Sequence, residues 1–221
     1  LYFQDSWNTN MQLTTASNLL DLYIGIYKQC RKKWQKMFSI FSSYVQEDLF
    51  TFNIKNIKKE ILNIKIKNKE KIISNYGGWQ SENFLKINKN FKELFNQINL
   101  SVEKIEKNLN LEKKLILHNY WCNINYLSCF NRPHSHLGSV ISGVYYVSTP
   151  KNCGNLIFEN YDGNKNITYK FVKNYNKYNS TKWTVVPKEN LCVLFPSYLV
   201  HYVEPNLNKK ERVSISFNYG F

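Results

Sequence analysis

The sequence is short of the residues that build disulfide frameworks and zinc knuckles. Its five cysteines are an odd number, and no two of them form a Cys-x-x-Cys pair. This set favours a reducing compartment, so we expect an intracellular, cytoplasmic protein. Long apolar runs are also missing. The most apolar N-terminal stretch, residues 19–27, is too short to cross a bilayer and leads into basic residues, so no membrane span is predicted.

Acidic residues are scarce as well. The chain has 16 Asp and Glu against 30 Lys and Arg, which gives a formal net charge of +14. Such an excess can attract nucleic acid or an anionic membrane surface. Here the lysines are dispersed among many asparagines and form no single tract. We therefore interpret the charge as a general feature of the composition and keep a nucleic-acid-binding surface as the alternative.

The chain divides into a helical and a strand-rich region. Residues 1–4 resemble the remnant of a cleavable tag. We predict a helical N-terminal region over 5–110 and a strand-rich core over 111–221. In the first region apolar residues recur at helical spacing in three stretches, separated by a short strand and a glycine-containing break. These elements are expected at residues 16–47 (helical), 49–54 (strand), 55–67 (helix), 74–80 (break) and 84–108 (helix).

From residue 115 the pattern changes to short apolar strands broken by Gly, Pro and Asn. Eight such strands after a helical half predict an α+β fold. Its core would be a double-sheet jelly roll, also called a double-stranded β-helix, with helices on one outer face. Residues 161–181, rich in Asn, Lys and Tyr, are expected to form a long hairpin or loop over the barrel mouth, with a solvated insertion and a substrate lid as equal interpretations. The strands are expected at about 115–127, 140–147, 155–159, 166–173, 182–187, 191–195, 200–203 and 212–219.

Histidine is rare, and two of the four histidines are one residue apart. If the segment around His134 and His136 is extended, its two-residue period points both imidazoles to one side. His201 follows a later apolar run and can close a facial triangle around a metal that keeps open coordination positions. Glu159 is a candidate carboxylate ligand in place of His136. Two loop histidines without a metal are the other interpretation.

The last strand has one polar and one apolar face. Arg212, Ser214, Ser216 and Asn218 share one parity, and the residues between them are apolar. In a jelly roll the apolar face can pack on the helices while the polar face lines the interior. Arg212 would then offer a bidentate fork and Ser214 a hydroxyl, a combination that suits a small dicarboxylate.

Two residues on other strands are further candidates for the pocket. Tyr146 has the parity of Ser142, so its hydroxyl would reach a bound dicarboxylate if this face lines the pocket; a core aromatic is the equal alternative. Asn123 follows Trp121 at strand spacing and is a pocket candidate on the same argument.

Five separated motifs make the chain resemble the Fe(II)/2-oxoglutarate-dependent oxygenase superfamily. Within it, the sequence is most similar to the phage- and bacterial-type putative 2-oxoglutarate oxygenases. The resemblance covers about residues 74–218 and extends upstream to Gly78-Trp79-Gln80-Ser81 and Trp121-x-Asn123-Ile124. The five motifs are His134-x-His136, Ser142–Tyr146, Gly154–Glu159, Phe195–Val203 and Glu211–Asn218.

The resemblance implies a double-stranded β-helix in which two histidines and an acidic residue hold iron and a basic residue holds 2-oxoglutarate. His134 and His201 fall on the histidine ligands, and Arg212 with Ser214 falls on the carboxylate site. His136 falls on the acidic ligand's position. Three neutral ligands would leave Fe(II) its full charge, which should raise its reduction potential and its affinity for an anionic cosubstrate. The candidate catalytic residues are His134, His136, His201 and Arg212, and the candidate cosubstrate residues are Arg212, Ser214, Tyr146, Asn123 and Asn218.

The implied activity is hydroxylation with O₂, with decarboxylation of 2-oxoglutarate to succinate and CO₂. A peptide or protein side chain, prolyl above all, is expected as substrate in preference to nucleic acid. A cupin-type metal protein is one alternative, although a cupin would place a glutamate where this chain has Val140-Ile141. A basic nucleic-acid-binding module on a degenerate oxygenase fold is the other.

Overall fold

The computed structural model of the protein describes residues 18–24, 42–160 and 172–221. Contacts divide the chain into two units, Leu1–Ser42 and Ser43–Phe221. In the first unit residues 18–24 are helical; the rest of the helix expected before residue 42 lies outside the described residues. No helix among the described residues is long and apolar enough to cross a membrane.

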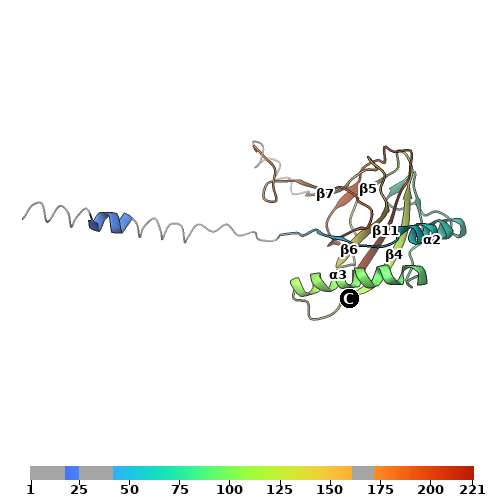
Figure 1. The fold of residues 1–221 in the computed structure, drawn as a ribbon, viewed down its shortest axis with the longest axis horizontal. Coiled ribbons are helices and arrows are strands. Elements are labelled where there is room, and N and C mark those ends of the chain that lie inside the picture. Colours follow the sequence, from blue (N-terminus) through green and yellow to red (C-terminus); the bar gives the residue numbers. More distant parts are fainter. Residues whose placement is uncertain (1–17, 25–41, 161–171) are drawn as a thin grey trace, which may run out of the picture. The chain divides into compact units, whose positions relative to one another are not determined.

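The second unit is built on two antiparallel sheets (Figure 1). The six-stranded sheet has the order β1 (Gln46–Leu49), β9 (Leu191–Pro196), β6 (Ile141–Ser148), β11 (Arg212–Gly220), β4 (Ile116–Asn125) and β3 (Trp79–Gln80). The five-stranded sheet has the order β2 (Asn75–Tyr76), β5 (Phe130–His134), β10 (His201–Val203), β7 (Leu156–Glu159) and β8 (Lys182–Val185). The predicted α+β jelly roll is confirmed.

Two helices, α2 (Ile54–Lys67) and α3 (Lys92–Asn108), pack on the six-stranded sheet (Figure 1). A 3₁₀ turn, η1 (Lys89–Phe91), precedes α3. Helix α2 begins where the Asn53 side chain accepts a hydrogen bond from the Lys55 amide at 3.2 Å, an N-cap. Its buried residues recur three and four positions apart, so a single face meets the sheet. These buried residues are Ile57, Ile61 and Ile64.

The two faces of β11 are used as predicted. Its apolar residues belong to the same buried cluster as the inner faces of α2 and α3. Its polar residues Arg212, Ser214 and Ser216 line a cavity on the opposite side, between the sheets. Neighbouring β4 follows the same rule, with Tyr120, Cys122 and Ile124 toward the helices. The alternation of strand side chains therefore separates a helix-packed core from a polar interior.

The boundaries differ from the sequence-based expectation at the N-terminal side. The strand expected at 49–54 is β1 at Gln46–Leu49, so the helix expected to run to residue 47 does not reach it. Helix α3 begins at Lys92 and not at 84, because Phe84 and Tyr120 exchange two backbone hydrogen bonds of 2.8 and 3.1 Å. This bridge pairs Phe84 with the sheet, and the helical turns begin only after Asn88, whose side chain accepts a hydrogen bond from the Asn90 amide.

Strand β5 was not predicted. It contains Pro133, which cannot donate to a ladder, and its side chains show no clean alternation of apolar and polar residues. Pairing with β2 on one side and β10 on the other nevertheless makes it a strand. Of the strand expected at 166–173, residues 166–171 lie outside the described residues, and residues 172–173 are not in a strand.

Gly143 on β6 makes room for the helix-facing core. It pairs with Phe217 across the ladder, and a Cβ at this position would lie 2.4 Å from the Phe217 ring and 2.9 Å from the Val193 carbonyl oxygen. We expect Gly143→Ala to lower the free energy of unfolding by about 2–3 kcal/mol through overpacking. Urea denaturation would measure the loss. In the double variant with Phe217→Leu, the combined loss should be smaller than the sum of the two single losses, and strict additivity would contradict this explanation.

Candidate active site

Three histidines from two segments of the chain converge between the two sheets. His134 ends β5 and is the cross-strand partner of His201, which begins β10. His136 lies just beyond β5. The ring centroids are 4.4 Å apart for His134 and His201, 5.0 Å for His134 and His136, and 5.2 Å for His136 and His201. One nitrogen from each ring lies within 4.8 Å of the others, so the three can ligate a single metal ion.

Two of the three imidazoles are held by backbone carbonyls. His134 Nδ1 is 2.6 Å from the Arg132 carbonyl oxygen, and His201 Nδ1 is 2.8 Å from that of Leu199. In each ring Nδ1 therefore carries the proton and Nε2 is left with a free lone pair, the tautomer that a metal requires. Among the described residues, no backbone carbonyl forms such a hydrogen bond with the ring of His136. The centroid of the His136 ring is 5.6 Å from that of the Trp121 ring. The backbone amide of His136 donates a hydrogen bond to the Ser197 carbonyl at 2.9 Å.

Burial keeps these imidazoles neutral. It lowers the pKa of His134, lowers that of His136 to about 4 and lowers that of His201 to about 3, and the neighbouring imidazoles add to the last two shifts. Neutral rings are the ligand form. Glu159, the alternative ligand, pairs instead with Lys182 at 3.0 Å and is not in the group that can hold a metal. The third possible metal ligand, beside His134 and His201, is therefore His136 and not Glu159.

Protonation should interfere little with metal binding. We expect the affinity for Zn(II) to fall less than tenfold between pH 7.5 and 5.5, because a lowered pKa keeps each ring neutral as the pH falls. An exposed imidazole with a pKa of about 6.5 would lose about tenfold in the same interval, and three would lose about a thousandfold. Competition titrations against a chromogenic chelator at both pH values measure this. A loss above a hundredfold would contradict the burial argument.

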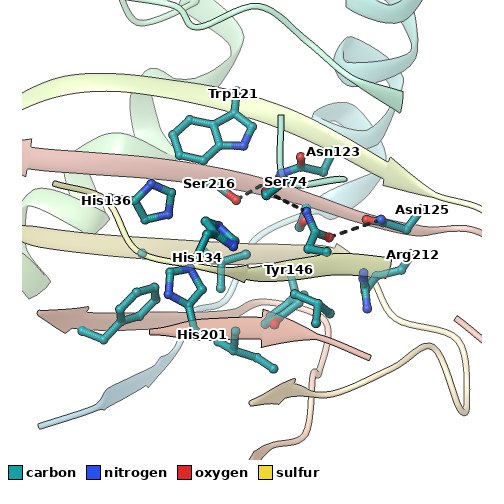
Figure 2. A pocket seen from close by; sticks show the side chains of 17 residues that line it. Ser74, Trp121, Asn123, Asn125, His134, His136, Tyr146, His201, Arg212 and Ser216 are labelled. Atoms are coloured by element: carbon teal, nitrogen blue, oxygen red, sulfur yellow. Dashed lines mark hydrogen bonds between the residues drawn. The ribbon is translucent and has the colours of Figure 1, made fainter. Parts of the chain in front are cut away.

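The histidines share an inner cavity of about 50 Å³ with Arg212. In Figure 2 the three rings gather at one end of the cavity and Arg212 lies toward the other. The Arg212 side chain is 2% exposed, and its Nη1 donates to the carbonyls of Cys153 at 2.7 Å and Gly154 at 3.2 Å. None of the ion pairs between described residues includes it. A buried cation without an anion fits an anionic ligand.

The ladder register arranges the inner face of the six-stranded sheet in rows. Ser214 on β11 pairs with Asn123 on β4 and with Tyr146 on β6, so these three form one row next to Arg212. Burial raises the pKa of Tyr146, whose phenol therefore stays protonated and can donate. The next row toward the histidines holds Trp121 and Ser216. Arg212, Ser214, Tyr146 and Asn123, all selected from the sequence, thus line one cavity.

Asn218 lies apart from this cavity and is occupied by protein partners. Its Oδ1 accepts from the Ser142 hydroxyl at 2.7 Å, and its Nδ2 donates to Asn119 at 3.0 Å. Ser142 in turn is hydrogen-bonded to the hydroxyl of Ser197, the residue whose carbonyl holds the His136 amide. This chain of hydrogen bonds fixes the segment that carries His136. The side chain of Asn218 borders the outer cleft described next.

A wider cleft of about 340 Å³ adjoins the inner cavity at His134 and His136. It shares Ser74, Trp121, His134 and His136 with the inner cavity. Its remaining side chains are apolar, amide or hydroxyl groups and one cation, and none is acidic. They are Ile73, Gln80, Asn83, Arg132, Pro133, Ser135 and Asn218. Sequence reasoning missed Ser74 and Asn131 in the inner cavity, because only long-range pairing of β2 and β5 brings them there.

The donor set fits Fe(II) and 2-oxoglutarate. Three neutral, buried imidazole nitrogens suit a divalent iron with open positions. Uncompensated Arg212 at the far end of the same cavity suits a carboxylate, and the protonated Tyr146 and the Ser214 hydroxyl suit its oxygens.

Comparisons with known proteins agree with this chemistry. Residues 119–218 match a family model described as putative 2OG-Fe(II) oxygenase, and the match contains all three histidines and Arg212. No curated protein matches the chain in sequence.

Several solved structures share the fold at low sequence identity. A prolyl-4-hydroxylase from Pseudomonas putida is 14% identical, with 81% of this chain and 93% of that chain covered and a TM-score of 0.58. The viral collagen prolyl hydroxylase of Paramecium Bursaria Chlorella virus-1 is 10% identical, with coverages of 80% and 97% and a TM-score of 0.52. HygX from Streptomyces hygroscopicus, with nickel, 2-oxoglutarate and hygromycin B bound, is 11% identical, with coverages of 80% and 83% and a TM-score of 0.52. At these identities the likeness shows the fold alone. With the family match over residues 119–218 and the histidine triangle inside it, this part of the chain belongs to the putative 2OG-Fe(II) oxygenase family, and the protein is a 2OG-Fe(II) oxygenase.

Proposed function

We propose that the protein hydroxylates a side chain of a peptide or protein, with proline as the favoured target. In the balanced reaction a substrate C–H bond becomes C–OH, 2-oxoglutarate becomes succinate and CO₂, and the two atoms of O₂ enter the new hydroxyl and succinate. The observation that carries the proposal is the histidine triangle, which lies between a cavity that contains a buried arginine and an open cleft with no acidic side chain.

In this proposal His134, His136 and His201 hold the iron, and Arg212 and Ser214 hold the far carboxylate of 2-oxoglutarate. When bound, Fe(II) supplies the chelation of the 2-oxo acid and the activation of O₂. The Tyr146 hydroxyl, next to Ser214 in the same row, donates to the same carboxylate. His134 and His201 donate hydrogen bonds from Nδ1 to the backbone carbonyls of Arg132 and Leu199, which keeps both rings in the ligating tautomer. Burial of the cavity excludes water from the reacting groups.

The outer cleft supports a peptide substrate. Exposed Asn83 and buried Gln80 carry amides that can pair with a peptide main chain, and Pro133 and Trp121 offer apolar contacts beside the histidines. Two of the three solved structures described above are prolyl hydroxylases. Nucleic acid is disfavoured, because Arg132 is the one Lys or Arg among the described residues that line the cleft, and a phosphate backbone needs several.

Succinate release by protein loaded with Fe(II) under anaerobic conditions and then exposed to air tests the proposal. We expect 2-oxoglutarate-dependent succinate from the wild type and at least a hundredfold less from His134→Ala, which removes a metal ligand, and from Arg212→Ala, which removes the cosubstrate anchor. Adding proline-containing peptides should increase the rate in the wild type, with a mass gain of one oxygen in the peptide.

Two results would overturn it. A wild type that, loaded with metal, neither binds 2-oxoglutarate nor turns it over is not using this cavity as proposed. Binding of DNA or RNA that weakens steeply with salt, in the absence of such turnover, would favour the basic nucleic-acid-binding module.

A further inference from the structure

One buried polar atom in the inner cavity has no partner. Among the described residues, Asn123 Oδ1 is the only buried side-chain nitrogen or oxygen without a hydrogen bond. The residue is 7% exposed, and its other amide atom, Nδ2, donates to the Ser216 hydroxyl oxygen at 3.1 Å. An unsatisfied buried carbonyl costs about 1–3 kcal/mol, so its persistence points to a donor that arrives with a ligand.

The register places Asn123 in the row of Ser214, one row away from Trp121. Asn123 belongs to the row of Ser214, but its amide leans toward Ser216, which lies in the row of Trp121. The Trp121 ring contacts His136 and borders the outer cleft. Figure 2 shows Asn123 and Ser216 joined by this hydrogen bond below Trp121. Asn123 therefore lies between the row that holds Ser214 and the row that holds Trp121, which borders the outer cleft.

The chemistry of 2-oxoglutarate excludes it as the partner. At neutral pH its two carboxylates and its 2-oxo group are all hydrogen-bond acceptors, and an acceptor cannot satisfy Asn123 Oδ1. Arg212, Ser214 and Tyr146 supply donors to it instead. The Ser216 hydroxyl, which accepts from Asn123, keeps its own proton free to donate in the same direction.

We propose that Asn123 determines substrate specificity by accepting a hydrogen bond from an N–H or O–H group of the peptide substrate, close to the C–H bond that is hydroxylated. This inference rests on the proposed function and refines it. A peptide main-chain N–H is a donor that every peptide substrate carries, whereas a purely apolar substrate would leave the oxygen unpaired. The opposite orientation of the amide would turn Nδ2 toward the cavity and make Asn123 a cosubstrate residue, which is the competing assignment.

The test separates the two ligands. Asn123→Leu keeps the shape of the side chain and removes both polar atoms, and Asn123→Ala is the second variant in case leucine disturbs the fold. The matched control is Asn99→Ala, which deletes an amide bonded to the Tyr219 hydroxyl on the helix-packed side of the sheet. Calorimetry on Zn(II)-loaded protein measures 2-oxoglutarate binding, and peptide-stimulated succinate release from Fe(II)-loaded protein measures KM for synthetic proline-containing peptides.

We expect both Asn123 variants to bind 2-oxoglutarate with a Kd within about threefold of the wild type. Their peptide KM should be at least tenfold higher, because one buried hydrogen bond to the peptide is lost. Asn99→Ala should match the wild type in both measurements. A tenfold weaker Kd for 2-oxoglutarate in both variants would overturn the proposal and assign the amide to the cosubstrate. An unchanged peptide KM would overturn it by leaving the oxygen to a bound water, and a wild type that no peptide stimulates would overturn the peptide class.

Failure of the proposed function is a separate result. It would appear in the wild type alone, as the absence of succinate formation from 2-oxoglutarate, before any variant is compared.

Discussion

Arg212→Met should weaken the binding of 2-oxoglutarate to Zn(II)-loaded protein at least a hundredfold. The guanidinium is almost completely buried, and only two carbonyl groups, those of Cys153 and Gly154, engage it among the described residues. Burial lowers the pKa of Arg212, which reflects the cost of holding its charge away from water. A carboxylate would offset that cost, and a charge-assisted bidentate pair contributes about 3–5 kcal/mol in such surroundings. Methionine keeps the volume and loses the whole interaction.

Two controls separate charge from geometry. Arg212→Lys keeps the charge but not the planar fork, so its loss should be intermediate, about tenfold. Ser214→Ala removes one neutral hydrogen bond and should cost about threefold to tenfold. Isothermal titration calorimetry with the catalytically inert Zn(II) measures all three. If Arg212→Met bound 2-oxoglutarate as well as the wild type, Arg212 would not be the residue that binds its far carboxylate, and the cosubstrate would lie elsewhere.

Much of this site is predictable from the sequence because strands impose strict alternation. The polar parity of β11 places Arg212, Ser214 and Ser216 in the interior, and the same rule brings Asn123 and Tyr146 to the neighbouring strands of one row. A register slip of one residue would turn every one of these side chains toward the helices, so the apolar parity that packs on α2 and α3 fixes the polar one as well.

The remainder depends on pairing between distant segments, which the sequence pattern does not contain. Strand β5 is irregular by itself and is a strand only because β2 and β10 flank it, yet it carries His134. Ser74 and Asn131 reach the cavity through the same pairing. The assignment of Asn218 to the cosubstrate illustrates a second limit. Parity gives it the correct face, but its position one row beyond Ser216 directs it to Ser142 and the outer cleft.

The two backbone carbonyls that accept hydrogen bonds from Arg212, those of Cys153 and Gly154, could not be predicted from the sequence pattern either. Gly154 adopts a φ of +85°, and a Cβ there would lie 2.1 Å from the Glu204 carbonyl oxygen and 3.0 Å from Arg212 Nη1. Only glycine lets the backbone approach the guanidinium so closely while staying in the left-handed region. The glycine that begins the third family-like motif therefore has a direct physical role, which is to bring a carbonyl to Arg212.

The three histidines should contribute unequally to metal binding. We expect His134→Ala and His201→Ala each to lower the affinity for Fe(II) by about a thousandfold, and His136→Ala by only about tenfold to a hundredfold. The rings of His134 and His201 are fixed by hydrogen bonds of 2.6 and 2.8 Å to backbone carbonyls, and the two residues are cross-strand partners. Little further ordering of these side chains is therefore needed when the metal binds. Within the part of the chain that the structure describes, the His136 ring has no such hydrogen bond and must be ordered on binding, which offsets part of its ligand strength.

His136→Asp gives the matched comparison, because it replaces the neutral imidazole of the third ligand with a carboxylate. The bound metal would then hold a net charge of +1 in place of +2, so affinity for the metal should be retained while affinity for dianionic 2-oxoglutarate falls about tenfold. Anaerobic Fe(II) titration followed by calorimetry with 2-oxoglutarate measures both. If the three alanine variants lost equal metal affinity, the Trp121 ring would have to orient His136 as firmly as the carbonyls orient its partners, and Trp121→Leu would then lower the affinity by the same amount.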